Sequence, residues 1–340
     1  MFSNKQRKFP ENFFPSEADD RLYMQRCLRL AAGGEGLTYP NPMVGSVIVH
    51  AGRIIGEGWH HRAGQPHAEP NAIRSVKDQS LLKESTLYVS LEPCAHHGKT
   101  PPCADLILEK QIPRVVVGCA DPFPAVSGQG IARLREGGAE VTVGVEEEAC
   151  LLLNRRFFTV HLAQRPHITL KWAQTLDAFI DRSRDDDSEP PLLLSDALTA
   201  TLCHRLRACS QLIAVGRRTQ ELDHPQLNIR HWPAPHGQQP AKAVISHRLT
   251  DQLPEWLHGL YEKGIQTLLV EGGSRLLQSF IDQDLWDEIQ VETAPFKLKS
   301  GHPAPLLPTP ADGHLSQKTV TADGHLMTTL IRRPEKFARV

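Results

Sequence analysis

The sequence predicts two α/β domains in succession, and three observations carry this prediction. The 340 residues exceed the roughly 100–200 residues of a typical single domain. Short β-rich runs alternate with helix-like segments, a pattern typical of α/β sandwiches. Hydrophobic residues make up 40% and charged residues 23% of the chain, which supplies apolar material for two cores. We place the domains at residues 17–145 and 146–340.

Charge and composition exclude several classes of function. The net charge is −1, and no aromatic-basic face is evident, so a nucleic-acid partner is not expected. No stretch approaches the ~20 apolar residues that cross a bilayer, and MFSNKQRKFPENFF lacks the core of a signal peptide. The chain has seven cysteines, an odd number. We therefore expect a cytoplasmic protein with reduced thiols and no membrane partner.

The first half reads as helices and strands in alternation. After a polar lead, residues 17–34 form a helix with an acidic first turn and a glycine stop. Residues 43–59 read as two strands around a tight turn. Further strands are expected over 85–91, 114–120 and 139–145, and further helices over 69–76, 102–110 and 128–138.

The second half also contains both helix-like and strand-like segments. A long helix is expected over 146–164, and a charged loop over 181–191. Helix-like segments cover 195–208 and 273–283. Strand-like segments cover 166–173, 211–216, 241–246, 267–273, 287–294 and 318–333.

The stretch LEPCAHHGKTPPC, Leu91–Cys103, has the features of a metal site. Cys94 follows a predicted strand, and Cys103 opens a predicted helix, whose N-terminus favours the thiolate that zinc requires. HAEP places His67 at another helix start. Catalytic zinc takes three protein ligands and keeps one position for water. Two thiolates and one neutral imidazole meet this requirement.

Glu69 lies two residues after His67 and is the candidate general base. A carboxylate there can take a proton from a zinc-activated water and deliver it to a departing amine. The order H-x-E followed by P-C and a second cysteine is the signature of zinc deaminases. Eight residues, AHHGKTPP, separate the two cysteines here, so we expect a loop beside the metal.

Two alternatives stay open at this point. A structural zinc with four protein ligands would recruit His96 or His97 and would fit a non-catalytic binding protein. A nucleic-acid-editing deaminase would share the zinc signature but not this long insert. The remaining cysteines are expected to be buried apolar side chains: Cys27, Cys119, Cys150, Cys203 and Cys209.

NPMVG, HAE and EPCAHHGKTPPC closely resemble the RibD family of riboflavin biosynthesis, which joins a pyrimidine deaminase to a pyrimidine reductase. The resemblance continues through DPFPAVSGQG and NRRFFT, and more weakly through LKWAQTLDAFID, HRLRA, VGRRT, DHPQLNIR and VEGGSRLLQSF. It covers about residues 20–300. It implies a cytidine-deaminase-like α/β/α sandwich followed by a dihydrofolate-reductase-like α/β domain.

The resemblance also implies a site in each domain. Zinc would bind His67, Cys94 and Cys103, and Glu69 would move protons. The pyrimidine nucleotide would contact Asn41, His60, Lys99 and Asp121. NADPH would contact Ala173, Thr219, Asp223 and Gly273. The reductase substrate would contact Arg207, Leu227, Arg230 and Glu271. Lys171 and Asp177 match a family strand motif. The family commonly forms homo-oligomers.

No GxGxxG follows a strand, so a Rossmann nucleotide site is not expected. TLLVEGGSRLL instead places Gly272 and Gly273 between a strand and a helix start, where phosphate binds readily. Arginine suits a 5′-phosphate because its fork donates two hydrogen bonds.

The implied function has two steps. Hydrolytic deamination of 2,5-diamino-6-(ribosylamino)-4(3H)-pyrimidinone 5′-phosphate precedes NADPH reduction of the ribosyl chain. The product is 5-amino-6-(ribitylamino)uracil 5′-phosphate.

The chain departs from the family pattern at several places. Phe123 replaces a family Asn, Ala178 a family Gly, and Pro191-x-Leu193-Leu194 a Ser-x-Trp motif. The DDD run would repel a 2′-phosphate if it lay beside one. The alternative function is therefore a deaminase carrying a degenerate reductase domain.

Overall fold

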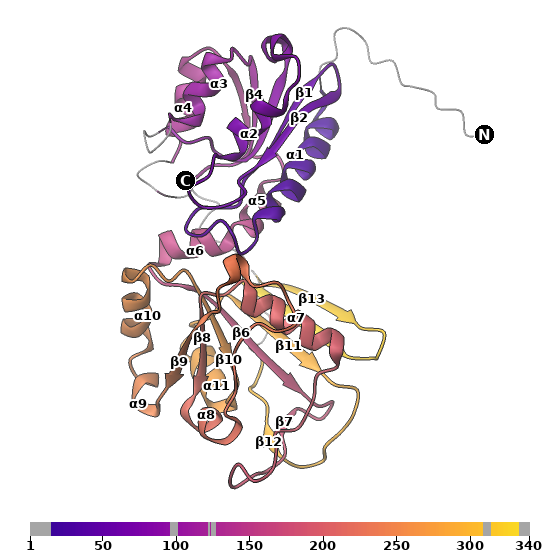
Figure 1. Ribbon diagram of the computed structural model, residues 1–340, viewed down its shortest axis with the longest axis vertical. Helices are drawn as coiled ribbons and strands as arrows, with labels where there is room; N and C mark the ends of the chain where they lie inside the picture. The colour runs from indigo at the N-terminus through magenta and orange to yellow at the C-terminus, as the bar shows by residue number, and fades with distance from the viewer. Residues whose placement is uncertain (1–14, 96–100, 122, 124–126, 309–313, 333–340) are drawn as a thin grey trace, which may run out of the picture. The chain divides into compact units, whose positions relative to one another are not determined.

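A computed structural model describes residues 15–95, 101–121, 123, 127–308 and 314–332. Contacts within the chain define two compact units, which divide between Phe158 and Thr159. The boundary expected at residues 145 and 146 precedes this division, because the helix that follows it packs with the first unit. Figure 1 shows a sheet with flanking helices in each unit.

The first unit is built on a five-stranded sheet with the order β2-β1-β3-β4-β5. β1 runs antiparallel to β2 and β3, and β3, β4 and β5 run parallel. The turn between β1 and β2 has positive φ at Ala51 and Gly52, as a tight hairpin requires. The strands are β1 (Gly45–His50), β2 (Arg53–Trp59), β3 (Thr86–Leu91), β4 (Arg114–Cys119) and β5 (Glu140–Val143).

Helices cover both faces of this sheet, so the predicted α/β/α sandwich is confirmed (Figure 1). α1 (Glu17–Ala31) and α5 (Glu147–Leu153) pack on one face. α2 (Ala68–Ser75), α3 (Cys103–Glu109) and α4 (Gln129–Glu136) pack on the other. Two 3-10 turns complete the unit, η1 (Ala32–Gly34) and η2 (Gln79–Glu84).

The single helix expected over 146–164 is divided in the structure. α5 ends at Leu153, and α6 (Arg155–Ala163) begins after Asn154. The Asn154 amide donates to the carbonyl of Met43 and accepts from its N–H, both at 2.8 Å. Asn154 is buried. This amide pair fixes the backbone of the NPMVG segment, and the sequence pattern had not predicted the break.

The second unit has a seven-stranded sheet with the order β13-β14-β11-β6-β10-β8-β9. β11, β6, β10, β8 and β9 are parallel, and β14 and β13 add an antiparallel edge. The strands are β6 (His167–Gln174), β8 (Leu212–Gly216), β9 (Ala241–Ile245), β10 (Thr267–Glu271), β11 (Glu288–Thr293), β13 (His314–Val320) and β14 (Leu326–Arg332). A separate short pair comprises β7 (Phe179–Asp181) and β12 (His302–Pro303).

Its main core joins one sheet face to α10 (Leu253–Glu262) and α11 (Ser274–Asp282). Ile213, Val215 and Leu269 face the other way, with Leu206 of α7 (Ala197–Ala208) packed against them. α8 (Arg217–Asp223), α9 (His247–Thr250) and η3 (Pro235–Gly237) lie in the connections. Among the described residues, no helix is long and apolar enough to span a membrane.

A tight turn follows β6 at the position where the family pattern has glycine. Ala178 adopts φ of 61°, a left-handed conformation that costs a residue with a Cβ roughly 1–2 kcal/mol. Asp177 holds the turn in place: it accepts from Thr175 Oγ1 at 2.6 Å and from the N–H groups of Leu298 and Lys299. The hydrogen bond from Thr175 is the main reason that the pKa of Asp177 is lowered to about 2.

We expect Ala178→Gly to stabilise the second unit. Relief of the left-handed strain exceeds the added freedom of the unfolded chain, so the free energy of unfolding should rise by about 0.5–1 kcal/mol. Denaturant unfolding followed by tryptophan fluorescence measures it. Ala200→Gly, inside α7, is the control and should lower stability by about 1 kcal/mol. Equal losses from both variants would show that Ala178 carries no strain.

Candidate active sites

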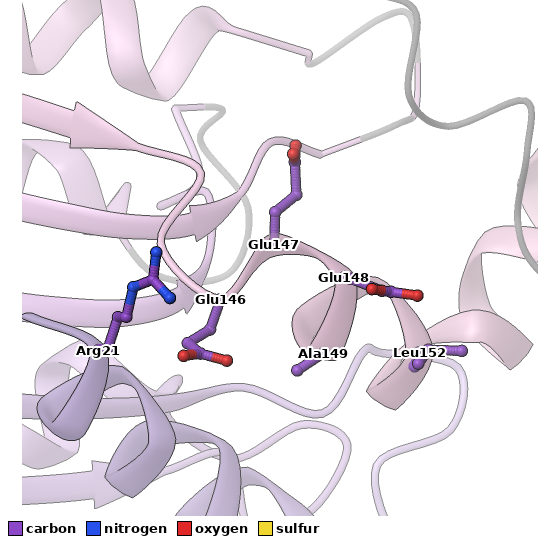
Figure 2. Close-up of a pocket in the computed structure, with 6 residues that line it drawn as sticks. All are labelled: Arg21, Glu146, Glu147, Glu148, Ala149 and Leu152. Atoms are coloured by element: carbon purple, nitrogen blue, oxygen red, sulfur yellow. The ribbon is translucent and has the colours of Figure 1, made fainter. Parts of the chain in front are cut away.

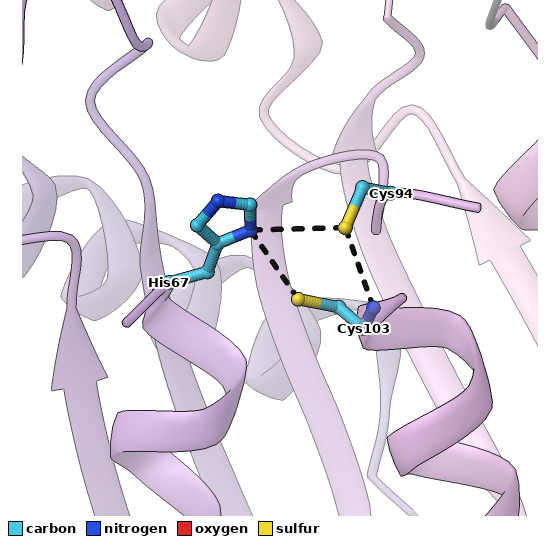
Figure 3. A group of neighbouring side chains, drawn as sticks. All are labelled: His67, Cys94 and Cys103. Atoms are coloured by element: carbon cyan, nitrogen blue, oxygen red, sulfur yellow. Dashed lines mark hydrogen bonds between the residues drawn. The ribbon is translucent and has the colours of Figure 1, made fainter. Parts of the chain in front are cut away.

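Three predicted ligands meet in the first unit. His67 is the residue before α2, Cys94 follows β3, and Cys103 is the first residue of α3. Their ligand atoms all lie within 4.8 Å of one another. Figure 3 shows the imidazole facing both sulfurs, with His67 Nδ1 at 3.7 Å from Cys94 Sγ and 3.4 Å from Cys103 Sγ.

These distances fit a shared zinc ion. Bond lengths of about 2.0 Å to nitrogen and 2.3 Å to sulfur at a tetrahedral angle place N and S roughly 3.5 Å apart. The N–H of Cys103 also donates to Cys94 Sγ at 3.3 Å. Hydrogen bonds from Cys103 and His67 lower the pKa of Cys94 to about 4. This lowered pKa favours the thiolate form that zinc binding requires.

Glu69 is buried in the first turn of α2, beside this group. Burial is the main cause that raises the pKa of its carboxyl to about 7. A carboxyl with a pKa near neutrality both accepts and returns a proton at physiological pH. A zinc ion would add positive charge nearby and favour the carboxylate.

Two predicted substrate contacts adjoin the ligand group. Asn41 Nδ2 lies 3.0 Å from His60 Nε2, and His60 Nδ1 lies 3.1 Å from the carbonyl of Pro66. His60 therefore donates from Nδ1 and accepts from Asn41. The His60 and His67 rings meet edge to face, with 5.4 Å between their centroids. Burial lowers the pKa of His60, which favours the neutral form that this pattern requires.

The other two predicted substrate contacts are Asp121 and Lys99. Asp121 follows β4 and accepts from the N–H of Phe123 at 2.9 Å. Lys99 lies outside the described residues, as do His96 and His97, the alternative fourth zinc ligands. Within the described residues, the metal-binding group comprises His67, Cys94 and Cys103.

In the second unit, Thr219 of α8 lies against the two glycines that follow β10. Gly272 and Gly273 have φ of 86° and 77°. A Cβ on Gly273 would meet Thr219 Oγ1 at 3.1 Å. The chain thus approaches Thr219 closely at the start of α11. Asp223, one helical turn after Thr219, forms an ion pair with Arg184 at 2.5 Å.

Two of the four predicted substrate residues of this unit, Arg207 and Glu271, are paired with each other. Arg207 donates from Nε and Nη2 to the Glu271 carboxylate at 2.7 and 2.6 Å. Its Nη1 donates to the carbonyl of Asn228. Arg230 Nη1 donates to the side chains of Gln226 and Asn228. Leu227, the fourth predicted substrate residue, is buried with Ile213, Val215 and Leu269 on the sheet face that α7 covers. Ala173, a predicted NADPH contact, is the register partner of Glu292 across β6 and β11.

The comparisons with known proteins match each unit of the chain to a known domain. Residues 17–119 match the cytidine and deoxycytidylate deaminase zinc-binding region, and residues 166–325 match the RibD C-terminal domain. The riboflavin biosynthesis protein RibD of Aquifex aeolicus is 37% identical over 81% of this chain and 87% of its own length. The chain belongs to the RibD family.

Solved RibD structures show the same fold over nearly the whole chain. Acinetobacter baumannii RibD has a TM-score of 0.80 at 29% identity, covering 93% of this chain and 99% of its own. A Thermotoga maritima deaminase/reductase has a TM-score of 0.79 at 31% sequence identity and also covers 93% of this chain and 99% of its own. The fold class predicted from the sequence is confirmed. This chain is a bifunctional enzyme of riboflavin biosynthesis, and the comparisons support both activities rather than the deaminase-only alternative.

Sequence reasoning missed Glu92 beside the metal centre of this RibD chain. Its buried carboxylate accepts from the backbone N–H groups of Asp121, Gly128, Gly130 and Ile131, at 2.8–3.3 Å. It therefore ties the residues after β4 and the start of α4 to the loop that carries Cys94. The position directly before Pro93-Cys94 was its one signal.

A pocket of about 330 Å³ lies at the start of α5 (Figure 2). Its six residues include none of the predicted site residues. Three are acidic, which disfavours a phosphorylated substrate, so we assign it no catalytic role. The lining residues are Arg21, Glu146, Glu147, Glu148, Ala149 and Leu152.

We expect Glu92→Gln to loosen the start of α4. The amide keeps the volume but replaces one acceptor with a donor facing backbone N–H groups, and hydrogen bonds to a charged group contribute about 1.5–3 kcal/mol. Hydrogen exchange of the α4 amides should accelerate at least about tenfold. Glu136→Gln, exposed in the last turn of α4, is the control. Unchanged exchange in Glu92→Gln would contradict this role.

Proposed function

We propose that His67, Cys94 and Cys103 hold zinc, and that Glu69 moves protons in the deamination of 2,5-diamino-6-(ribosylamino)-4(3H)-pyrimidinone 5′-phosphate. One observation carries the proposal: His67 Nδ1 lies at zinc-ligand spacing from both sulfurs, with Glu69 buried alongside. Zinc, when bound, activates a water at neutral pH. Glu69 accepts a proton from that water and returns one to the departing amine.

The neighbouring polar residues are proposed to orient the pyrimidine. Asn41 uses one amide N–H on His60 and keeps its carbonyl and second N–H for the base edge. His60 is held by the Pro66 carbonyl, which fixes its ring. Asp121, at the end of β4, remains a proposed contact to the pyrimidine nucleotide. Lys99 remains a proposed contact to its ribose-phosphate, from the family resemblance alone.

The second unit is proposed to bind NADPH at Ala173, Thr219, Asp223 and Gly273. The free N–H groups at the start of α11 and the close approach of Thr219 support this position. Arg207, Leu227, Arg230 and Glu271 are proposed to contact the substrate. Since the Arg207 fork is occupied by Glu271, phosphate binding there requires Arg207 to share or exchange this partner. A homo-oligomer and a cytoplasmic location also stay predictions.

Glu69→Gln should retain zinc and lose deaminase turnover by about 10²–10⁴-fold, because the amide cannot carry a proton. Ammonia release and zinc content measure the two effects. Glu57→Gln, in β2 and paired with Arg26, is the control and should release ammonia normally. Full turnover by the Glu69 variant would refute the assigned role.

Zinc removal should separate the two activities. Chelation removes the ion that His67, Cys94 and Cys103 are proposed to hold, so ammonia release should stop and return when zinc is added back. NADPH oxidation with the deaminated intermediate should persist, because the proposed reductase residues all belong to the second unit. Loss of both activities, with both units still folded by calorimetry, would contradict this separation.

A further inference from the structure

A buried polar cluster in the second unit centres on Glu292, which no prediction had included. Glu292 has no exposed surface. Ser195 Oγ donates to its Oε2 at 2.6 Å, and His325 Nδ1 donates to its Oε1 at 2.9 Å. Lys171 Nζ lies 3.8 Å from Oε2. A carboxylate buried to this extent persists only where charge and hydrogen bonds compensate it.

Strand alternation places this cluster beside the proposed reductase site. Ile289 and Val291 of β11 point into the main core, so Glu292 points to the opposite face, toward α7. Glu292 pairs with Ala173 in the register of β6, and Lys171 projects from the same face two residues earlier. Lys171 is also the register partner of Glu271 on β10.

Distance singles out Glu292 as the counterion of Lys171, whose Nζ lies 3.8 Å from the Glu292 carboxylate. Arg207 donates two hydrogen bonds to Glu271 and so balances that carboxylate. Cys203 also faces Lys171, but burial raises the pKa of its thiol, and a neutral thiol adds no charge. Among the residues that the structure describes, Glu292 is the one carboxylate within ion-pair distance of Lys171.

The neighbours of Lys171 also shift its pKa. Burial acts to lower the pKa of Lys171, yet the pKa is raised overall, because Cys203, Glu271 and Glu292, in that order of size, oppose burial. Among the described residues, the Lys171 ammonium has no hydrogen bond beyond its approach to Glu292. Its donors are therefore available to a ligand.

His325, which donates to Glu292, also lies close to a second carboxylate, that of Asp196. His325 Nε2 lies 3.6 Å from Asp196 Oδ2. This buried oxygen has no hydrogen-bond partner within the part of the chain that the structure describes. Asp196 Oδ1 caps α7 through the N–H of Thr199. The imidazole is thus held between two carboxylates, and it fixes the orientation of Glu292 toward Lys171.

We propose that Glu292 is a positioning residue of the reductase: its carboxylate keeps Lys171 protonated, so that Lys171 supplies the proton consumed in ring opening. The proposal rests on the reductase function proposed above. Hydride addition to C1′ breaks the C1′–O4′ bond, the electron pair stays on O4′, and O4′ takes the proton. The hydride comes from the nicotinamide, and solvent returns the proton to Lys171.

The test is Glu292→Gln, which keeps the shape and the acceptor for Ser195 but removes the charge. Loss of an anion within about 4–6 Å lowers the pKa of an ammonium by about 1–3 units. The basic limb of the reductase kcat profile should move to lower pH by that amount. Above the new limb kcat should fall at least about tenfold, while KM changes little.

A second readout needs neither cofactor nor substrate. The rate at which Lys171 reacts with an amine-selective acylating reagent, read by peptide mass spectrometry across pH, reports its protonation in the ligand-free full chain. Glu292→Gln should shift this curve by the same interval. Glu288→Gln, a second buried carboxylate on β11, is the matched control and should leave the curve in place.

The outcomes separate this proposal from the reductase assignment. An unshifted Lys171 curve in Glu292→Gln overturns the role of Glu292, whatever the enzyme reduces. If Glu292→Gln shifts the Lys171 curve but the wild-type chain oxidises no NADPH with the deaminated intermediate, the reductase assignment is overturned. The proton role of Lys171 is then overturned with it. If Glu292→Gln does not fold, Glu292→Asp, which moves the charge away from Lys171, should shift the curve in the same direction by less.

Discussion

The metal centre depends on two helix starts being held against one sheet. His67 and Cys103 stand at the starts of α2 and α3, and the N–H of Cys103 donates to Cys94 Sγ. Ala72 and Ile73 of α2 and Ala104 and Ile107 of α3 share a buried core with the strands. Apolar packing therefore sets the ligand spacing before any ion binds.

Close contact between α2 and β2 tightens this constraint. A Cβ on Gly58 would lie 2.3 Å from the N of Ala72 and 2.7 Å from the carbonyl oxygen of Ala68. Only glycine fits there, and any larger residue would push α2 outward. Because α2 carries Glu69 and begins beside His67, such a shift would separate the proposed general base and His67 from the two sulfurs.

The sequence predicted the centre because each ligand lies in a local pattern. A helix start, a strand end and the H-x-E order are readable within a few residues. Glu92 and Asn154 were missed because their partners are backbone groups distant in the sequence. Only the folded chain brings those groups together. The ranges of most strands and helices followed from alternation, which reports burial but not partners.

Glu292 illustrates the same limit in the second unit. The run DEIQVETA was read as a strand, and β11 forms there. Alternation alone would assign Glu292 to a solvated face, whereas α7 covers it, and Lys171 and His325 approach it from β6 and from the residues before β14. A buried acid and a surface acid look alike in a sequence until the neighbouring elements are placed.

The charge near the acidic DDD run also depends on ion pairs that form only in the folded chain. From its sequence, DDD was expected to repel a 2′-phosphate. The structure places Arg184, whose side chain is 4% exposed, between Asp181 and Asp223 at 2.5 Å from each. A buried guanidinium that bridges two carboxylates halves their net charge and holds the segment by hydrogen bonds. Neither of these carboxylates belongs to the DDD run, residues 185–187, so Arg184 leaves the charge of the run itself unchanged. Within the run, Asp186 accepts from the N–H of Ser188, and Asp187 Oδ2 lies 3.2 Å from His224 Nε2.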